Sequence, residues 1–197
     1  EMLLRSYREL AGLFAAEVTS FERKRYANLS HAPNKAMNLN SYIALMGRRL
    51  VEKPSRRGLV LRAAPRTAPG FKVPDAEYVL TLDADSLLEP RYMVRLVHFL
   101  EREENSRVAV AQTPYSAIPD APRSIERIAG ATTDIQYVIH QGFTAYGATF
   151  WVGANALLRK RAFEDIATTV RDERTGADVV RYIQDRTVIE DTESSVD

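Results

Sequence analysis

A strand–helix–strand pattern between residues 78 and 111 most restricts the fold of this chain. The short, apolar, β-rich run at 78–82 predicts a buried strand. A helix is predicted from Pro90, because apolar residues recur at helical spacing as far as Leu100. The apolar run at 108–111 predicts a second strand. This order indicates a βαβ unit, and therefore an α/β fold with a parallel or mixed sheet and a right-handed crossover.

Weaker patterns predict the rest of the secondary structure. Apolar residues at helical spacing predict helices over 2–17, 36–50 and 124–141. The stretch 53–75 is rich in Pro, Arg and Gly and is expected to form a loop, interrupted at most by a short apolar run. A brief strand is expected at 187–189.

Composition sets broad limits on fold and function. A chain of 197 residues with 45% hydrophobic residues is expected to form one domain, spanning residues 1–197, with a real core. The net charge of +1 predicts no nucleic-acid, membrane-surface or polyacid partner. Because the chain has no Cys, disulfides, thiolate nucleophiles and Cys-ligated zinc are excluded. No apolar run approaches the roughly 18 residues that cross a bilayer.

Two carboxylates follow the first predicted strand of the βαβ unit. Asp83 and Asp85 lie at the carboxyl end of that strand, where open α/β sheets bind ligands. Two hard oxygen ligands suit Mg²⁺ or Mn²⁺ when substrate phosphates and water complete the coordination. The alternative is that an Asp or Ser side chain caps the following helix. Capping needs only one carboxylate and leaves the second without a role.

Lys35 stands at the start of a predicted helix, within the segment HAPNKAMNLN at residues 31–40. A cation and amide side chains at a helix N-terminus can hold a phosphate through charge and donated hydrogen bonds. The alternative is an ordinary polar helix start, with Asn as the cap and Lys35 in solvent. Taken alone, the segment favours this second interpretation.

Two further segments can carry chemistry. The small residues of Gly153-Ala154-Asn155 let a flat ligand approach the backbone, while Trp151 or Phe150 offers a face for a sugar. Equally, Trp151 fits a core position. Glu190-Asp191 ends a strand-like run, where a carboxylate can act as a general base toward a hydroxyl. A solvated acidic pair or a helix cap is the alternative.

Together and in this order, five segments resemble glycosyltransferase family 2, and more narrowly its membrane-embedded, cellulose-synthase-like branch. They are HAPNKAMNLN, YVLTLDADSLLEP, VAVAQTPYS, FWVGANALLRKRAF and TVIEDTES. The resemblance covers residues 31–197 and leaves 1–30 as an unassigned helical segment. It implies a GT-A fold, a Rossmann-like mixed sheet flanked by helices, in which nucleotide-sugar and acceptor meet at the carboxyl ends of the strands.

The resemblance also implies roles for individual residues. It places Asp83 and Asp85 in a metal motif, with Asp85 favoured as the direct ligand, and it places Lys35 and Asn38 beside Asp83 at the donor diphosphate. It assigns Asp191 as the catalytic base. Acceptor binding is implied for residues of three segments: Gln112, Thr113, Pro114, Gly153, Ala154, Asn155 and Glu190. The sequence departs from the family pattern at Met37, where Gly is frequent, and at Ile189, where Thr is usual.

The chemistry implied by the resemblance is inverting transfer of a sugar from a nucleotide-diphosphate sugar, such as a UDP-sugar, to a glycan hydroxyl, with Mg²⁺ or Mn²⁺ as cofactor. A second hypothesis is a non-catalytic, glycosyltransferase-like module that binds carbohydrate or serves assembly. A third is a Mg²⁺-dependent nucleotidyl or phosphoryl transferase, which would use Asp83 and Asp85 but gives Asp191 no role.

The two ends of the sequence lead to an expectation about the parent protein. The chain opens at Glu1 and stops at Asp197 without a turn or cap signal, so we expect a GT-A domain incomplete at both ends, excised from a longer polypeptide. No Asp-Asp segment for uridine and no Gln-x-x-Arg-Trp motif is recognised, so the fragment is expected to be weak or inactive alone. The resemblance implies a parent on the cytoplasmic face of the cell membrane, attached through parts outside this soluble fragment.

Overall fold

The computed structural model describes residues 2–13, 17–65, 67–118, 121–152 and 155–184. The helices are α1 (Met2–Leu13), η1 (Arg23–Arg25), α2 (Lys35–Ile43), α3 (Tyr92–Leu100), η2 (Glu103–Asn105), α4 (Ser124–Ala145) and α5 (Lys160–Asp165). The strands are β1 (Arg49–Ser55), β2 (Gly58–Ala63), β3 (Phe71–Lys72), β4 (Tyr78–Thr81), β5 (Val110–Gln112), β6 (Ala156–Arg159), β7 (Thr168–Arg171) and β8 (Asp178–Arg181). The predicted α/β class is confirmed.

The strands form three small antiparallel sheets, in the orders β2-β1-β3, β4-β6-β5 and β7-β8. The predicted βαβ unit is present as β4, α3 and β5, but the parallel pairing expected of it is wrong. β6 lies between β4 and β5 and is antiparallel to both, so these two strands run in the same direction without touching. β6, which comes much later in the chain, occupies the position between β4 and β5 and prevents their direct pairing.

The segment between α2 and β4 differs most from expectation. The helix predicted over 36–50 ends at Ile43 and is followed by a turn, in which Gly47 adopts a left-handed conformation with φ of 76°. The predicted loop at 53–75 instead holds most of a β1–β2 hairpin, and Gly58 at the turn has φ of 113°. The free edge of β2 is covered by the chain at Asn28, whose side-chain amide exchanges two hydrogen bonds with the Leu61 backbone.

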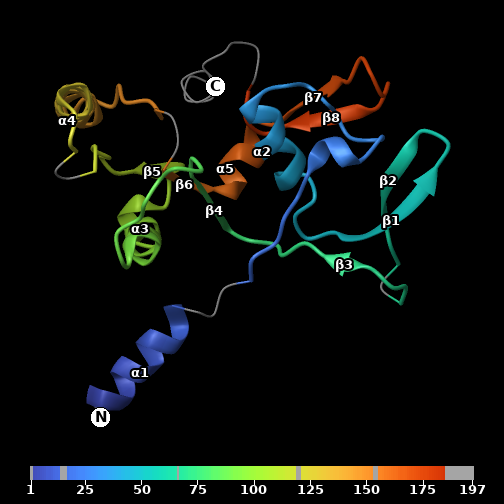
Figure 1. Ribbon diagram of the computed structural model, residues 1–197, viewed down its shortest axis with the longest axis horizontal. Helices are drawn as coiled ribbons and strands as arrows, with labels where there is room; N and C mark the ends of the chain where they lie inside the picture. The colour runs from blue at the N-terminus through green and yellow to red at the C-terminus, as the bar shows by residue number, and fades with distance from the viewer. Residues whose placement is uncertain (1, 14–16, 66, 119–120, 153–154, 185–197) are drawn as a thin grey trace.

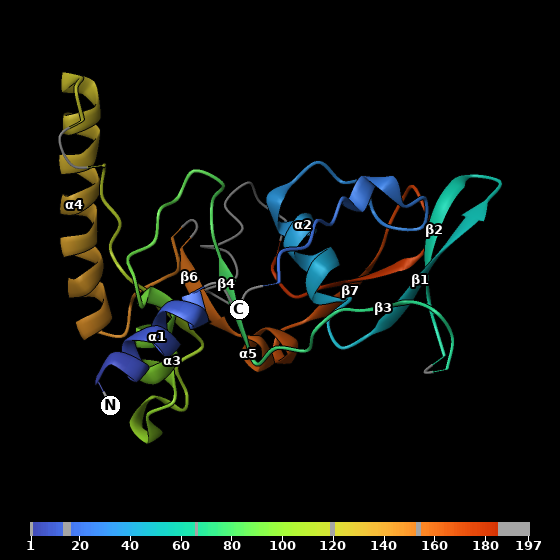
Figure 2. The ribbon, with the colours of Figure 1, turned by 60° about the horizontal axis from the view of Figure 1, so that its bottom comes forward.

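The amphipathic patterns at 2–17 and 124–141 are confirmed as helices, over Met2–Leu13 and Ser124–Ala145 respectively. Figures 1 and 2 show α4 and the β1–β2 hairpin at opposite ends of the molecule, with α2, α5 and the β4-β6-β5 sheet between them. The side chains of α1 whose exposure is described are all exposed, and Figure 1 shows the helix standing away from the body.

Three apolar clusters hold these elements together. One joins α2, β6 and α5 around Leu158 and Phe163, a second joins β1 and β2 to Tyr26, and a third joins α3 to the β4-β6-β5 sheet through Leu100 and Leu157. Tyr26 brings part of the unassigned N-terminal segment into the core. In the part of the chain that the structure describes, no helix combines the length and apolarity needed to span a bilayer.

Candidate functional site

The start of α2 and the end of β4 bring two of the predicted site residues into direct contact. The Lys35 ammonium donates a hydrogen bond of 2.8 Å to Asp83 Oδ1, and the two side chains are 40% and 50% exposed. Lys35 is the first residue of α2, where Asn34 acts as the N-cap by accepting a hydrogen bond from the Met37 amide. The Asn cap of the simpler interpretation is therefore present, but Lys35 is not merely solvated.

Asp83 and Asp85 lie on a turn that directly follows β4. The Ser86 amide bonds back to the Asp83 carbonyl, and both carboxylates are exposed. The helix-capping interpretation is wrong, because the N-cap position of α3 is Arg91 and no side chain caps it. Neither carboxylate is therefore needed to start α3.

Two carboxylates can be enough to hold a divalent cation when a substrate supplies the remaining ligands. Among the described residues, no group of three or more His, Asp or Glu side chains is arranged to hold a metal. Mg²⁺ in phosphate-handling sites takes one or two carboxylates and fills the rest of its octahedron with phosphate oxygens and water. Asp83 and Asp85 supply that number of ligands, and both are open to solvent.

Asn38, predicted at the donor diphosphate, is engaged from within the protein. Its side-chain oxygen accepts two hydrogen bonds from the Arg23 guanidinium, of 3.1 and 2.9 Å. The Arg23 side chain is nearly fully buried, which lowers its pKa, and it also donates to the carbonyls of Ser30 and Ala32. Arg23 therefore braces the loop that leads to Lys35, and Asn38 anchors this brace on α2.

The implied acceptor segments meet at the ends of β4 and β5. The Gln112 side-chain amide donates to the Val152 carbonyl at 2.6 Å, and its oxygen accepts from the Val152 amide at 3.1 Å. The Asn155 amide bonds to the Thr81 carbonyl at 2.8 Å, and Asn155 has φ of 66°, a conformation that Asn tolerates better than most residues. The segment between these two anchors contains Gly153-Ala154, which lies outside the described residues.

Tyr92, the first residue of α3, connects the same segments. Its hydroxyl donates to the Asn155 carbonyl at 2.8 Å and accepts from Thr113 Oγ1 at 3.2 Å. The role of Tyr92 was not predictable from the sequence, because a tyrosine in the first turn of an amphipathic helix carries no signal of its own. Only the position of α3 beside β5 and β6 makes this residue a link.

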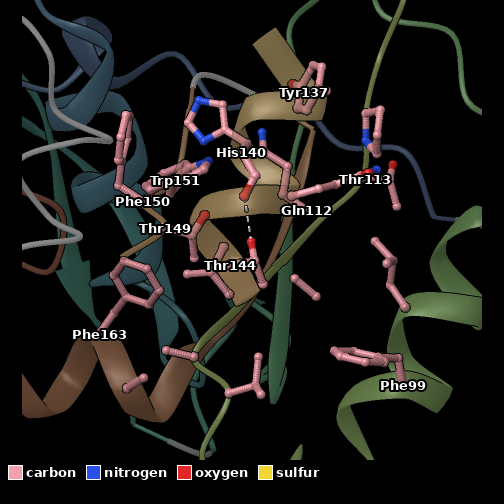
Figure 3. A pocket seen from close by; sticks show the side chains of 18 of the residues that line it. Phe99, Gln112, Thr113, Tyr137, His140, Thr144, Thr149, Phe150, Trp151 and Phe163 are labelled. Carbon is pink, nitrogen blue, oxygen red and sulfur yellow. Dashed lines mark hydrogen bonds between the residues drawn. The ribbon is translucent and has the colours of Figure 1, made fainter. Parts of the chain in front are cut away.

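A cavity of about 760 Å³ opens beside the outer edge of β5. Gln112, Thr113 and Pro114 line it together with Tyr137 and His140 of α4 (Figure 3). Phe150 faces His140 edge to face, with ring centroids 4.7 Å apart. Burial raises the pKa of the Tyr137 phenol.

Trp151 is a core residue, as the simpler interpretation predicted. It is 5% exposed and packs edge to face on Phe163 of α5. Phe150 offers an aromatic face to a ligand in this region, because it is only half-buried and lines the cavity.

The chain leaves the described residues at Gln184, tied to α2. Asn40 is fully buried, accepts hydrogen bonds from the amides of Tyr182 and Ile183, and donates to the Ile183 carbonyl at 2.7 Å. The role of Asn40 was not predicted from the sequence, because Asn40 is one of several polar residues near the start of a helix and nothing in the sequence distinguishes it. The predicted base Asp191, together with Glu190, lies outside the described residues.

Comparison with known proteins gives one match. The family model described as "Glycosyl transferase family group 2" matches residues 78–197, which include β4, the Asp83–Asp85 turn, α3 and all later elements. No curated protein and no solved structure shows significant similarity to the chain.

Proposed function

Since the chain belongs to glycosyl transferase family group 2 and is a glycosyltransferase, we propose that it transfers a sugar from a nucleotide-diphosphate donor to a glycan hydroxyl with inversion at the anomeric carbon. The observation that carries this proposal is the contact between Lys35 and Asp83. It joins a cation at a helix N-terminus to a carboxylate at a strand end, which are the two groups that a diphosphate and its counter-ion need.

Lys35 is the donor-side cation in this proposal. In the free protein its ammonium rests on Asp83, and the half-exposed pair adds little to stability. When a nucleotide-diphosphate sugar arrives, Lys35 turns to the diphosphate, where it neutralises part of the charge that develops on the leaving group. The N-terminus of α2 contributes in the same direction, because the positive end of the helix dipole favours an anion.

Asp83 and Asp85 would hold the divalent cation, Mg²⁺ or Mn²⁺. A bound cation would supply electrostatic stabilisation of the departing diphosphate. The protein's own contribution is the turn at Asp83–Ser86, which keeps both carboxylates at the end of β4 and free of helix capping.

Asp191 is the proposed general base. Gln184 is held beside α2 through the Asn40 anchor, and the seven positions from 184 to 191 reach at most about 25 Å when extended. Asn40 stands about 7.5 Å along the α2 axis from Lys35, at 1.5 Å per residue. This length of chain is compatible with the proposed role of Asp191 and supports it.

The bonds change as follows in the proposed reaction. The Asp191 carboxylate takes the proton of the acceptor hydroxyl while the hydroxyl oxygen forms a bond to the anomeric carbon. The bond from that carbon to the diphosphate breaks on the opposite face, and its electron pair leaves with the nucleoside diphosphate. General-base assistance of this kind contributes about 10²- to 10⁴-fold in rate.

The acceptor is proposed to lie along Gln112, Thr113, Pro114 and the 153–155 segment, with Glu190 beside the base. Hydrogen bonds fix Val152 to Gln112, and Asn155 to Thr81 and Tyr92, on the two sides of positions 153–154. We propose that these bonds help to orient the acceptor sugar toward the donor. Phe150 offers the half-exposed ring on which a sugar can pack.

Finer features of the proposal follow the sequence resemblance. We place the protein in the cellulose-synthase-like branch, with a GT-A arrangement, a UDP-sugar as donor and a polysaccharide or glycoconjugate as product. Its parent protein would work at the cytoplasmic face of the cell membrane.

The test is donor hydrolysis and sugar transfer by the full-length protein with a panel of nucleotide sugars. Asp191→Asn is expected to reduce kcat by at least 100-fold with donor binding retained. Asp178→Asn, an exposed substitution of the same kind at the start of β8, is the matched control and is expected to keep normal turnover. Unchanged turnover in Asp191→Asn would remove the proposed base.

Binding measurements separate the remaining alternatives. Mn²⁺-dependent binding of a nucleoside diphosphate supports catalysis at the Lys35–Asp83 site. Binding of an oligosaccharide without dependence on metal or nucleotide would instead support a carbohydrate-binding module. A nucleotidyl transferase would retain its activity in Asp191→Asn.

A further inference from the structure

The β2-β1-β3 sheet separates its charges by face. Side chains alternate between the two faces of a strand, and directly paired residues share a face. On β1, Arg49 and Lys53 therefore point to one side, and the pairings Arg62 with Val51 and Lys72 with Arg49 place these two further cations on the same side. We call Arg49, Lys53, Arg62 and Lys72 the basic face.

Part of the opposite face of the sheet packs against the protein interior. Leu50 and Leu61 point to that side and form part of the core around Tyr26. Glu52, the only acidic residue between positions 48 and 72, also points there. It accepts a hydrogen bond of 2.6 Å from the Tyr26 hydroxyl and lies 3.8 Å from Arg25. Glu52 therefore does not neutralise the basic face, because its partners lie on the other side of the sheet.

The cations of the basic face are not neutralised within the described part of the chain. Lys53, Arg62 and Lys72 are exposed, and none of the ion pairs in that part includes them or Arg49. Arg49 is half-buried, but its guanidinium donates only to the neutral carbonyl of Ala68, at 3.1 Å. Two further exposed cations, Arg56 and Arg57, occupy the hairpin turn at the outer end of the same strands.

The net charge of +1 hides this arrangement, because it averages over the whole chain. The expectation that a balanced chain has no membrane-surface partner assumes that charges are mixed. Here the strand register sorts them, so that the charged side chains on one face of a projecting sheet are all cations, with Val51 and the buried Val60 between them. Figures 1 and 2 show this sheet at one end of the molecule, away from the β4-β6-β5 sheet and α4.

We propose that the basic face docks on a lipid bilayer surface that carries anionic phospholipid headgroups. A sheet presents its side chains in one layer, which matches a planar array of negative charge better than a single convergent anion. Each Lys or Arg close to such a surface strengthens binding about fivefold. The inference stands apart from the proposed catalytic chemistry, since no residue of the basic face takes part in it.

Charge and ring placement favour a membrane over a nucleic acid. Single-strand binders stack bases on aromatic side chains, and the strands of this sheet carry one aromatic residue, Phe71. Phe71 pairs with Leu50 and so points away from the basic face. With cations but no ring on this face, the phosphate groups of lipid headgroups are the ligands that it fits.

The test is co-sedimentation of the 197-residue chain with phosphatidylcholine vesicles, with and without phosphatidylserine. The chain is expected to bind only vesicles that contain phosphatidylserine, and to be released as NaCl rises from about 0.05 to 0.5 M. Lys53→Gln with Arg62→Gln should lower the partition coefficient about thirtyfold. Both side chains are exposed and without hydrogen bonds in the described structure, so thermal melting should be unchanged.

The matched control is Arg95→Gln with Arg107→Gln, which removes the same charge from exposed positions outside the sheet. This pair is expected to change partitioning less than threefold. Equal losses in the two pairs, or equal binding to vesicles without phosphatidylserine, would overturn the proposal. Binding of a soluble polyanion such as RNA, weakened by the Lys53 and Arg62 substitutions in the absence of vesicle binding, would overturn the choice of lipid.

Discussion

The Lys35 ammonium lies 2.8 Å from the Asp83 carboxylate, although 48 positions separate the two residues in the chain. Lys35 begins α2 and Asp83 follows β4, so the contact joins the start of a helix to the end of a strand. A surface ion pair of this exposure is worth less than about 1 kcal/mol. Its importance therefore lies in the position of the two charges and not in stability.

We expect Lys35→Met to raise the Kd of a nucleoside diphosphate about 10- to 100-fold in the presence of Mn²⁺, because a charge-assisted hydrogen bond to phosphate is lost. Isothermal titration calorimetry measures this change. The free energy of unfolding should move by less than about 1 kcal/mol. Lys24→Met, which removes an exposed cation from η1, is the control and should leave the Kd unchanged. An unaltered Kd in Lys35→Met would contradict the donor-side assignment.

Tyr92→Phe removes one hydroxyl that joins Thr113 to the Asn155 carbonyl. We expect a stability loss of about 1 kcal/mol, the usual contribution of one hydrogen bond. We also expect a rise in KM for the acceptor of the full-length enzyme, with KM for the donor nearly constant, because the hydroxyl holds the acceptor segment. Initial-rate kinetics with each substrate varied in turn separate the two constants.

The control for this substitution is Tyr78→Phe, which removes a hydroxyl that is bonded to Glu101 and Arg159 at a distance from the acceptor segment. It should cost similar stability and leave both KM values unchanged. If Tyr92→Phe alters stability alone, the tyrosine supports the fold and does not position the acceptor.

The sequence-based predictions succeeded where a pattern is long and one-sided. α4 and α3 were recognised because their apolar residues recur at the helical period, and β4 because it is a compact apolar run. The contact between Lys35 and Asp83 was anticipated only in outline, because the resemblance assigned both residues to the donor. Charged residues next to predicted strand and helix ends can be recognised from the sequence by residue type and position alone.

The hairpin and the order of the second sheet were not predictable in the same way. Leu50 continues the helical spacing of Ile43 and Met46, so local periodicity predicted a helix, whereas pairing with Ala63 and Phe71 makes Leu50 a strand residue. β6 enters between β4 and β5 from more than forty positions away, and nothing in its own sequence specifies that place. Tyr92 and Asn40 escaped notice for the same reason, since their partners come from distant segments.

Asn40→Ala should be among the most destabilising single substitutions in this chain. It leaves the amides of Tyr182 and Ile183 and one carbonyl without partners in a site with 0% exposure. We expect a loss of about 2–4 kcal/mol in the free energy of unfolding, measured by urea denaturation. Amide hydrogen exchange at Tyr182 and Ile183 should accelerate in the variant. Asn105→Ala removes a single hydrogen bond, to the Phe99 carbonyl, and should cost about 1 kcal/mol; equal losses in the two variants would contradict the anchoring role of Asn40.

Asp172 gives the fold a defined acid sensitivity. Partial burial raises the pKa of its carboxyl, but hydrogen bonds from Ser30 and Thr175 outweigh this and lower the pKa to about 2, from an ordinary 3.8. The unfolded chain therefore binds the proton first as the pH falls. The stability contributed by Asp172 is fully present above about pH 4 and is lost as the pH falls from about 4 to 2.

This contribution is expected to be about 1 kcal/mol, because the partly exposed carboxyl is screened by solvent. Urea denaturation at a series of pH values between about 2 and 5 should show a smaller acid-dependent loss for Asp172→Asn than for the parent chain. Asp178→Asn, at the exposed start of β8, serves as the control and should follow the parent profile. Ser30 lies in the loop that Arg23 braces ahead of Lys35, so the same acid titration should loosen the donor side. A parallel pH profile in Asp172→Asn and the parent would show that this carboxylate does not hold the β7–β8 turn against that loop.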